Sequence, residues 1–176
     1  LPMTMDHHDV EQYVSMVYGR ARTCIMVETA AAMARLDKIL AVPGVDEIFV
    51  GLNDLHISMG LTFMFELLSG GLVEYIAQKC NRAGMPFGFG GIARIGDGDL
   101  PSDYILGEHV RLGSQSVILS RTFKGEVGTA SKDVSLKEEV YKVRKRMREI
   151  EKWNDNDFAE NRQRIAIGVD KILSRK

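Results

Sequence analysis

Apolar and polar positions along residues 1–120 follow two patterns that alternate. Short apolar runs predict β-strands, and apolar residues at helical spacing predict helices between them. The predicted strands are residues 23–27, 46–50, 86–93 and 115–120. The predicted helices are residues 9–18, 30–40, 63–83 and 103–112, and Gly70-Gly71 is expected to bend or break the third. Strands that alternate with helices indicate an α/β fold with a parallel sheet.

The last third of the chain has a helical pattern without strands. Small residues at 125–131 form a linker, and Ser135 with Glu138 has the spacing of a capping box for the next helix. The apolar residues of that helix recur at alternating spacings of four and three, which places them on one stripe. They are Leu136, Val140, Val143, Met147 and Ile150. A final amphipathic helix is expected to start at residues 155–157.

Composition narrows the class of protein. With 45% hydrophobic and 27% charged residues among 176, the chain resembles an ordinary soluble globular protein. A net charge of −1 argues against a nucleic-acid partner, and no apolar run approaches the length of a membrane span. Cys24 and Cys80 lack metal or redox spacing, and we find no secretory signal. We therefore expect reduced thiols in a cytoplasmic protein.

A carboxylate follows each of the first two predicted strands. Glu28 comes directly after the run that ends at Val27, and Asp54 comes four positions after Val50. In a parallel βαβ unit the carboxyl ends of both strands lie level, so the two acids are expected to face one another. Close carboxylates repel unless a proton or a cation lies between them. A hard divalent cation bound between the two carboxylates usually removes this repulsion.

The residues around these acids also carry a family resemblance. VET at residues 27–29, ILAVPGVD at 39–46 and GLNDLHISMG at 51–60 together resemble the HpcH/HpaI aldolase/citrate lyase family. The resemblance implies a metal-dependent TIM-barrel enzyme that makes or breaks a carbon–carbon bond next to a keto acid. It covers residues 1 to about 122, and more loosely the tail. The separation of 26 residues from Glu28 to Asp54 also fits the family.

By this resemblance, Glu28 and Asp54 are the metal ligands. Mg²⁺ or Mn²⁺ suits two carboxylates whose shell is completed by water and substrate oxygens, and Co²⁺ is a further option. The ion would hold a pyruvate-type 2-keto acid and stabilise the enolate that carbon–carbon cleavage leaves. The expected function is therefore that of a class II aldolase, a lyase that joins or splits a 2-keto acid and an aldehyde.

The loop that begins at Gly51 is the expected substrate site. In the family, the backbone N–H groups at the positions of Asn53 and Asp54 bind the pyruvate carboxylate. The chain departs from the related aldolases at Leu52, where they carry Pro, and at Met26, where they often carry a substrate-binding Gln. Met26 is either a packing residue of the barrel interior or a wall of the substrate pocket.

The length of the chain is short for the fold that the resemblance implies. A (β/α)8 barrel needs about 250 residues, with about 200 at the low end. Residues 1–3 resemble the end of the family's fourth strand. We therefore expect the C-terminal half of a TIM-type barrel over residues 1–124 and a helical tail over 125–176. The family's general base and substrate-binding Arg belong to earlier strands, so no catalytic residue is assigned here.

The cluster Asp6-His7-His8-Asp9 has two interpretations. Two histidines between two acids suggest a metal site. Adjacent side chains on a helix point about 100° apart, however, so both rarely bind one ion. An exposed first helical turn with Asp6 as N-cap is the simpler interpretation.

Other polar positions offer weaker candidates. The run GFGGIA at 88–93 matches a dinucleotide-binding fingerprint by letter, but a loop follows it, so we interpret it as a strand of small side chains. Arg94 is expected to contact an anionic substrate group or a surface carboxylate. His56 is either a polar neighbour of the metal or an exposed loop residue. Ser120 lacks a partner for nucleophilic catalysis, and His109 is expected on the surface of its helix.

Two alternative functions stay open at this point. One is a citrate-lyase-β-like enzyme that acts on an acyl-CoA, and the other is a non-catalytic barrel fragment that folds with another chain. The apolar stripes of the tail need a surface to cover. That surface is either the barrel of a neighbouring subunit, which would make a homo-oligomer, or this same chain.

Overall fold

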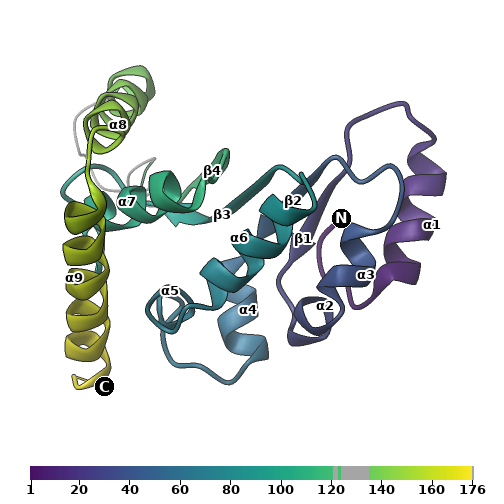
Figure 1. Ribbon diagram of the computed structural model, residues 1–176, viewed down its shortest axis with the longest axis horizontal. Coiled ribbons are helices and arrows are strands. Elements are labelled where there is room, and N and C mark those ends of the chain that lie inside the picture. The colour runs from purple at the N-terminus through teal and green to yellow at the C-terminus, as the bar shows by residue number, and fades with distance from the viewer. Residues whose placement is uncertain (121–122, 124–134, 176) are drawn as a thin grey trace. The chain divides into compact units, whose positions relative to one another are not determined.

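The computed structural model describes residues 1–120, 123 and 135–175 (Figure 1). It is an α/β fold with a parallel four-stranded sheet in the order β1-β2-β3-β4. The chain divides into unit 1, which is Leu1–Gly90 with Ser114–Ser116, and unit 2, which is Gly91–Gly113 with Val117–Lys176. This division does not follow the domain boundary at residue 124, which stays a prediction. The linker expected at 125–131 lies outside the described residues.

Unit 1 contains the first three strands, except the end of β3, and the helices around them. In chain order its elements are α1 (His7–Val17), β1 (Cys24–Val27), α2 (Ala30–Ala34), α3 (Leu36–Leu40), β2 (Glu47–Val50), α4 (Leu52–Ser58), α5 (Glu66–Ser69), α6 (Leu72–Arg82) and β3 (Phe87–Ile92). All three strands and the break at Gly70-Gly71 agree with the sequence predictions. Gly71 makes the break with a φ of +78°, a conformation that favours glycine.

Two stretches of unit 1 differ from the sequence predictions. The helix expected at 30–40 is divided at Arg35, whose N–H is shared by the carbonyls of Ala31 and Ala32. Residues 51–60 were expected to be loop, but Leu52–Ser58 form α4. Its buried Leu52 and Leu55 lie three positions apart, so packing of one apolar side stabilises a helix that the turn-forming residues obscured.

The register of β1 and β2 brings the ends of both strands level. Val27 lies opposite Val50, and the N–H of Gly51 donates to the carbonyl of Val27 at 3.1 Å. On the other side of β1, the backbone of Leu1 donates to Cys24 and accepts from Met26, which is the bonding pattern of a parallel strand. The residues that follow β1 and β2 therefore start from the same edge of the sheet.

The core of unit 1 lies mainly on one face of β1 and β2. The strand residues Ile25, Val27, Ile48 and Val50 are all fully buried. Helices α2, α3 and α6 supply the covering side chains, which include Ala32, Leu36, Ile39, Ile76 and Cys80. On the opposite face of these two strands Cys24 and Met26 are only partly buried, whereas Phe49 is buried.

Two glycines of β3 make room for side chains from neighbouring elements. A Cβ on Gly88 would lie 2.1 Å from Oγ of Ser116, which donates to the Glu47 carboxylate at the start of β2. A Cβ on Gly90, whose φ is +61°, would lie 2.8 Å from Cδ1 of Leu52. No helix follows β3 directly, since the next helix begins at Ser102. The interpretation of 88–93 as a strand of small side chains is therefore confirmed.

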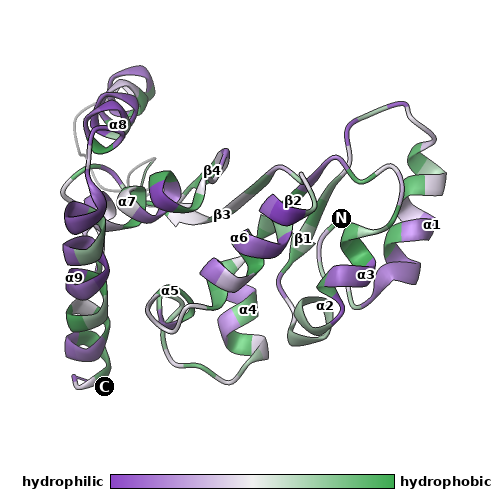
Figure 2. Cartoon of the chain, in the orientation of Figure 1, coloured by the Kyte–Doolittle hydropathy of each residue, from purple (hydrophilic) through white to green (hydrophobic). Residues whose placement is uncertain are grey.

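Unit 2 packs its helices around a second core. Its elements are α7 (Ser102–Leu112), β4 (Ser116–Leu119, with Ser116 in unit 1), α8 (Leu136–Ile150) and α9 (Asp155–Leu173). Helices α8 and α9 both contact α7, and both are amphipathic in Figure 2. The buried side chains of the core are Ile92, Leu106, Phe123, Val143 and Ile150. Of the apolar stripe predicted for α8, Leu136 is 50% exposed and stands outside this core.

The ends of the last two helices differ in their caps. Ser135 precedes α8 as expected, but its side chain forms no capping hydrogen bond, so the predicted capping box is wrong. Asn154 caps α9 instead with a complete capping box, in which Asp157 is the reciprocal partner. Among the described helices, none has both the length and the apolar character needed to cross a bilayer.

Candidate active site

Glu28 is a buried carboxylate at the carboxyl end of β1. It follows Val27, the last residue of the strand, and its exposed fraction is 3%. Thr29 then caps α2: its Oγ1 accepts the N–H of Ala32 and donates to the carbonyl of Thr4 at 2.8 Å. The strand before Glu28 and the capped helix after it fix the backbone on both sides of the carboxylate.

The side chain of Glu28 is held by residues that are distant in sequence. Its Oε1 accepts the N–H of Met3 at 2.6 Å. Met3 has a φ of +53°, in the left-handed region that non-glycine residues seldom adopt. Backbone strain of this kind persists only where the surroundings impose it, and here it accompanies the hydrogen bond to Glu28.

Glu28 also packs directly against Gly51, the residue just before α4. A Cβ on residue 51 would lie 2.7 Å from Oε2 of Glu28 and 2.8 Å from its Cβ. Only glycine fits at this position without displacing the carboxylate. The structure therefore brings the motif after β1 against the start of the motif after β2, as the sequence predicted for the two strand ends.

Asn53 and Asp54 lie in the first turn of α4. Both are exposed, and Asp54 is the acidic residue at the third helical position. Gly51 stands at the N-cap and supplies no side chain, so no side chain caps the first turn of α4. The turn that carries Asp54 thus begins at the glycine that touches Glu28.

The donor set suits a hard divalent cation. A buried carboxylate is costly unless charge or hydrogen bonds compensate it. Among the described residues, Glu28 forms no ion pair, and its carboxylate accepts one hydrogen bond, from the N–H of Met3. An ion with oxygen ligands would compensate that charge, with Asp54 as the second carboxylate. The residues present therefore fit the metal that the sequence implied.

Met26 and Leu52 mark the positions where the chain departs from related aldolases. Met26 is partly buried, and its Cε lies 3.4 Å from where a Cβ of residue 51 would be. Leu52 is buried at the start of α4 against Gly90. Leu52 is thus a core residue, whereas Met26 lies beside the loop that begins at Gly51.

His56 belongs to α4 and not to a loop. It is partly buried, and its Nδ1 lies 3.2 Å from the carbonyl oxygen of Leu52, one turn earlier. This contact sets one ring nitrogen against the backbone of its own helix. The interpretation as an exposed loop histidine is therefore wrong, and a role near the metal stays a prediction.

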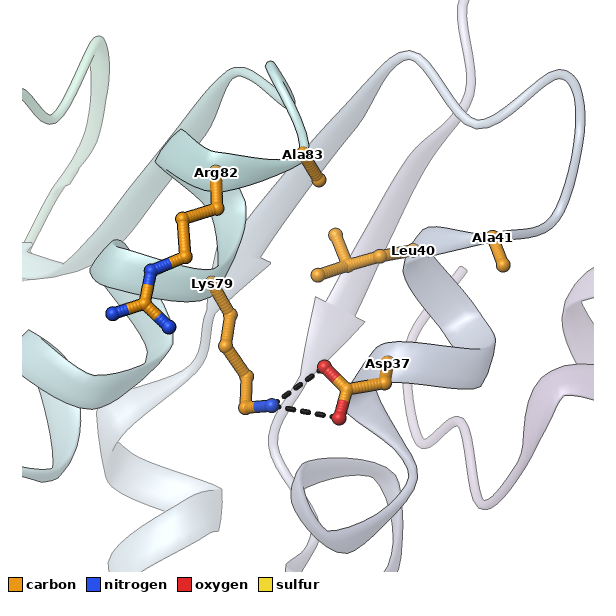
Figure 3. A pocket seen from close by; sticks show the side chains of 6 residues that line it. All are labelled: Asp37, Leu40, Ala41, Lys79, Arg82 and Ala83. Carbon is orange, nitrogen blue, oxygen red and sulfur yellow. Dashed lines mark hydrogen bonds and ion pairs between the residues drawn. The ribbon is translucent and has the colours of Figure 1, made fainter.

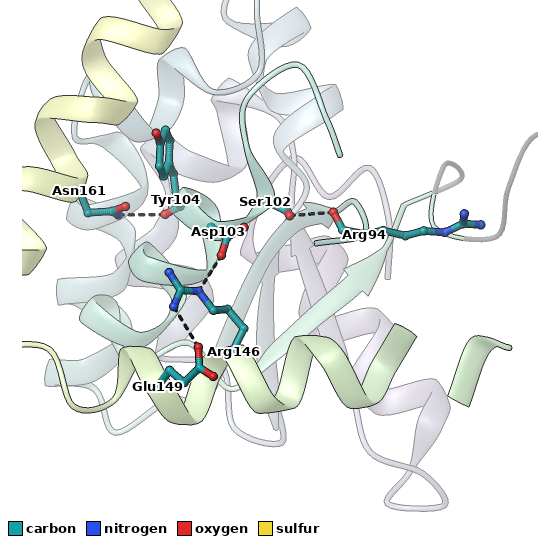
Figure 4. Close-up of polar contacts among 7 residues, drawn as sticks. All are labelled: Arg94, Ser102, Asp103, Tyr104, Arg146, Glu149 and Asn161. Atoms are coloured by element: carbon teal, nitrogen blue, oxygen red, sulfur yellow. Dashed lines mark hydrogen bonds and ion pairs between the residues drawn. The ribbon is translucent and has the colours of Figure 1, made fainter. Parts of the chain in front are cut away.

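The candidates in unit 2 have structural partners (Figure 4). Arg94 donates from Nε to the carbonyl of Phe123 at 2.9 Å, and its own carbonyl accepts from Ser102. Arg146 joins α8 to α7 through Asp103 at 2.6 Å. The N–H of Ser120 donates to the carbonyl of Ile92. A contact between Arg94 and a substrate anion stays a prediction.

A cavity of about 360 Å³ lies between α3 and α6, on the helical layer of unit 1 (Figure 3). Its lining residues are Asp37, Leu40, Ala41, Lys79, Arg82 and Ala83. Lys79 contacts both carboxylate oxygens of Asp37 at 2.6 Å. None of the lining residues follows the carboxyl end of a strand, so this cavity is separate from the site at Glu28.

Three titratable groups, the buried His109 and Cys80 and the half-buried Cys24, do not suit chemistry at neutral pH. His109 is 3% exposed, so its expected surface position is wrong, and burial lowers its pKa to about 3. Burial raises the pKa of the Cys80 thiol to about 12. Burial, and to a smaller extent the nearby Glu47 carboxylate, also raises the pKa of the Cys24 thiol. A neutral imidazole and protonated thiols indicate packing roles for all three.

Comparison with known proteins decides the family. The sequence model of the HpcH/HpaI aldolase/citrate lyase family matches residues 1–88, half of the chain. The chain belongs to this family. The match contains both Glu28 and Asp54, so the resemblance seen in the sequence is confirmed.

Curated relatives of this HpcH/HpaI family chain are aldolases. The hydroxypyruvate/pyruvate aldolase of Rhizorhabdus wittichii is 35% identical over 77 residues, which are 40% of this chain and 31% of the relative. The hydroxypyruvate/pyruvate aldolase of Roseovarius nubinhibens is 40% identical over 52 residues, which are 30% of this chain and 20% of the relative. The HpcH/HpaI chain thus spans less than a third of the length of each relative.

A solved structure shares the fold of this family member. The protein CitE from Mycobacterium tuberculosis, in complex with magnesium and acetate, has a TM-score of 0.53 and a sequence identity of 12%. The match covers 94% of this chain and 61% of that protein. At this identity the likeness shows the fold alone.

Sequence reasoning missed two features of the site in this HpcH/HpaI chain. One is the hydrogen bond from Met3 to Glu28, which depends on a φ of +53° at Met3 that its residue type disfavours. The other is the contact between Glu28 and Gly51. The glycine itself was the available signal, because glycine between a strand and a helix often marks a close approach of backbone.

Proposed function

We propose that this chain forms the metal-binding part of an aldolase that joins or splits a pyruvate-type 2-keto acid and an aldehyde. The observation that carries the proposal is the buried Glu28 carboxylate, packed against Gly51, the N-cap of the helix that carries Asp54. Membership of the HpcH/HpaI family and the two aldolase relatives support the class of reaction. Because each relative is more than three times longer than its aligned segment, the activity is proposed for the whole protein.

Glu28 and Asp54 would hold the ion, and Mg²⁺ or Mn²⁺ suits their oxygen ligands. When bound, the ion supplies positive charge beside the oxygen that becomes negative as the carbon–carbon bond breaks. Glu28 contributes a ligand that is already oriented, because the N–H of Met3 donates to its Oε1, while its Oε2 lies beside Gly51. Burial of Glu28 keeps the charge in a medium where electrostatic interactions are stronger than in water.

The substrate carboxylate would bind at the start of α4. Asn53 and Asp54 are exposed there, and no side chain caps the backbone N–H groups of this turn. Those N–H groups would orient the 2-keto acid by donating hydrogen bonds to its carboxylate. Met26 forms an apolar wall beside Gly51, where related aldolases often carry a glutamine. Methionine in place of glutamine favours a 2-keto acid that has no polar group on the side facing Met26.

The parallel sheet and the Leu1 backbone beside β1 support placement of these strands in a (β/α)8 barrel. A homo-oligomer assembled through the C-terminal helices is proposed as well. Tyr141 on α8 is 61% exposed and Ile167 on α9 is 67% exposed, so both helices keep apolar side chains in solvent. Light scattering of the protein at several concentrations tests this assembly.

The experiment that tests the site is a calorimetric titration with Mn²⁺, in the presence and absence of oxalate. We expect binding that oxalate strengthens, because oxalate presents two adjacent oxygens to the ion, as a 2-keto acid does. Glu28→Gln and Asp54→Asn each keep the shape of the side chain and remove its charge, so both are expected to abolish binding. Asp99→Asn, which changes an exposed acid of unit 2, is the matched control. Unchanged Mn²⁺ affinity in both site variants would overturn the assignment.

A further inference from the structure

The first turn of α1 brings together three metal-ligating side chains outside the proposed active site. One ligand atom each from His7, His8 and Glu11 lie within 4.8 Å of one another. The rings of His7 and His8 have centroids 4.0 Å apart, and Nδ1 of His8 lies 3.2 Å from Oε2 of Glu11. The divergence expected for adjacent helical histidines is therefore not found at this helix end.

The neighbouring carboxylates already accept hydrogen bonds from the backbone at the start of α1. His7, His8 and Glu11 are therefore the side chains available as ligands. Asp6 accepts the N–H groups of His8 and Asp9, and Asp9 accepts those of Met5 and Asp6. This complete capping box confirms Asp6 as the N-cap. The backbone at the start of α1 is thus fixed, and the histidines project from an ordered turn.

The cluster contains an unsatisfied nitrogen and a favourable local charge. Nδ1 of His7 is buried and has no hydrogen-bond partner among the described residues, which is costly for a polar atom. Asp6, Asp9 and Glu11 supply three carboxylates here, and no lysine or arginine occurs before Arg20. These charges offset the positive end of the α1 dipole, which by itself opposes a cation.

We propose that His7, His8 and Glu11 bind a transition-metal ion of the zinc type. Two imidazoles and one carboxylate suit Zn²⁺, Ni²⁺ or Cu²⁺, whereas Mg²⁺ prefers oxygen ligands. His8 and Glu11 are 69% and 54% exposed, so an ion reaches them from solvent, and water completes its coordination. The ion takes the place of the direct 3.2 Å contact between Nδ1 of His8 and Oε2 of Glu11. This site is chemically distinct from Glu28 and Asp54 and does not depend on the proposed aldolase function.

The test is a Zn²⁺ titration of the protein with Mg²⁺ in large excess, so that oxygen sites are occupied by Mg²⁺. His7→Gln, His8→Ala and Glu11→Gln are each expected to weaken Zn²⁺ binding by about tenfold or more, since even changes outside the direct ligands cost that much in metal sites. His56→Gln removes a histidine elsewhere and is expected to leave the affinity unchanged. Glu28→Gln is expected to leave it unchanged as well, which separates this site from the proposed active site.

A spectroscopic measurement on the unmodified protein guards against variants that misfold. One equivalent of Cu²⁺ should give an electron paramagnetic resonance spectrum with coupling to two imidazole nitrogens. Coupling to no histidine nitrogen would overturn the proposal. So would a Zn²⁺ affinity that none of the three substitutions changes, or that Glu28→Gln abolishes.

Discussion

The backbone N–H of Met3 and the carboxylate of Glu28 are joined by a 2.6 Å hydrogen bond across 25 positions of sequence. A hydrogen bond to an ionised carboxylate is stronger than one between neutral groups. The segment before α1 therefore helps to position the proposed metal ligand at the end of β1. A substitution at Met3 can change the backbone of this contact without removing the donor.

Met3→Gly is expected to preserve Mn²⁺ binding and to stabilise the fold by up to about 1 kcal/mol. The side chain of Met3 is 61% exposed, so little packing is lost. Glycine adopts positive φ readily, which relieves a strain of about 1–2 kcal/mol, although its greater freedom in the unfolded chain offsets part of the gain. Urea unfolding and Mn²⁺ titration measure both effects.

Tyr18→Gly is the matched control for Met3→Gly. Tyr18 has a φ of +51° at the end of α1 and is 85% exposed, but it has no contact with Glu28. A similar gain in stability is expected from both variants. Loss of Mn²⁺ binding in Met3→Gly alone would show that the Met3 side chain, and not its N–H, supports Glu28.

Gly51→Ala is expected to weaken Mn²⁺ binding on the order of tenfold and to destabilise the fold by about 1–3 kcal/mol. The added Cβ would lie 2.7 Å from Oε2 of Glu28, so the carboxylate must move. Gly91→Ala is the control, because a Cβ there would meet its nearest neighbour at 3.6 Å. Wild-type affinity in Gly51→Ala would contradict the close packing of Glu28 on Gly51.

The stability of the protein is expected to fall as the pH decreases from about 6.5 toward about 3, in part because of His109. Burial lowers the pKa of this side chain from 6.5 to about 3 in the folded protein. Over that interval the unfolded chain binds a proton that the folded chain does not, so acid favours unfolding by up to about 1.4 kcal/mol per pH unit. Urea unfolding at several pH values between 5 and 7 measures the slope.

His109→Gln removes this titration and should therefore flatten the pH dependence. If His109→Gln and the wild type show the same slope between pH 5 and 7, the buried neutral state of His109 is wrong.

Asn161→Ala is expected to destabilise unit 2 by about 1–3 kcal/mol. The side chain is 1% exposed, and its Nδ2 donates to the carbonyl of Tyr104 on α7 at 2.9 Å. Removing it leaves a carbonyl without this donor and a space beside Gly107. Gln163→Ala, at an exposed position of the same helix, should change the unfolding free energy by less than about 0.5 kcal/mol. Equal effects of the two substitutions would contradict the role of Asn161.

The strands were predictable because each is a short, largely apolar run, although burial differs among them: Ile118 in β4 is 52% exposed. The same rule places Glu28 at a strand end, since the run stops at Val27. Helix α4 was less accessible to sequence reasoning. Gly51, Asn53 and Asp54 are turn-forming residues, and the helix depends on the burial of Leu52 and Leu55 within the folded chain.

Contacts between distant residues were not predictable from local pattern. His109 is buried on α7, a helix that contacts both α8 and α9, and the residue types around it in sequence do not specify that burial. The convergence of His7 and His8 likewise contradicts the usual divergence of adjacent helical side chains. Neither feature follows from the local sequence pattern.

The two glycines of β3 bear on how a mutational scan of this protein would be interpreted. Gly88 and Gly90 leave space that Ser116 and Leu52 occupy. Nearly every substitution at either position is therefore expected to be deleterious, although neither residue carries a functional group. Loss of function on substitution in β3, the strand whose sequence most resembles a cofactor motif, would then reflect steric clashes with Ser116 and Leu52. A mutational scan interpreted without the structure would place the active site on the wrong strand.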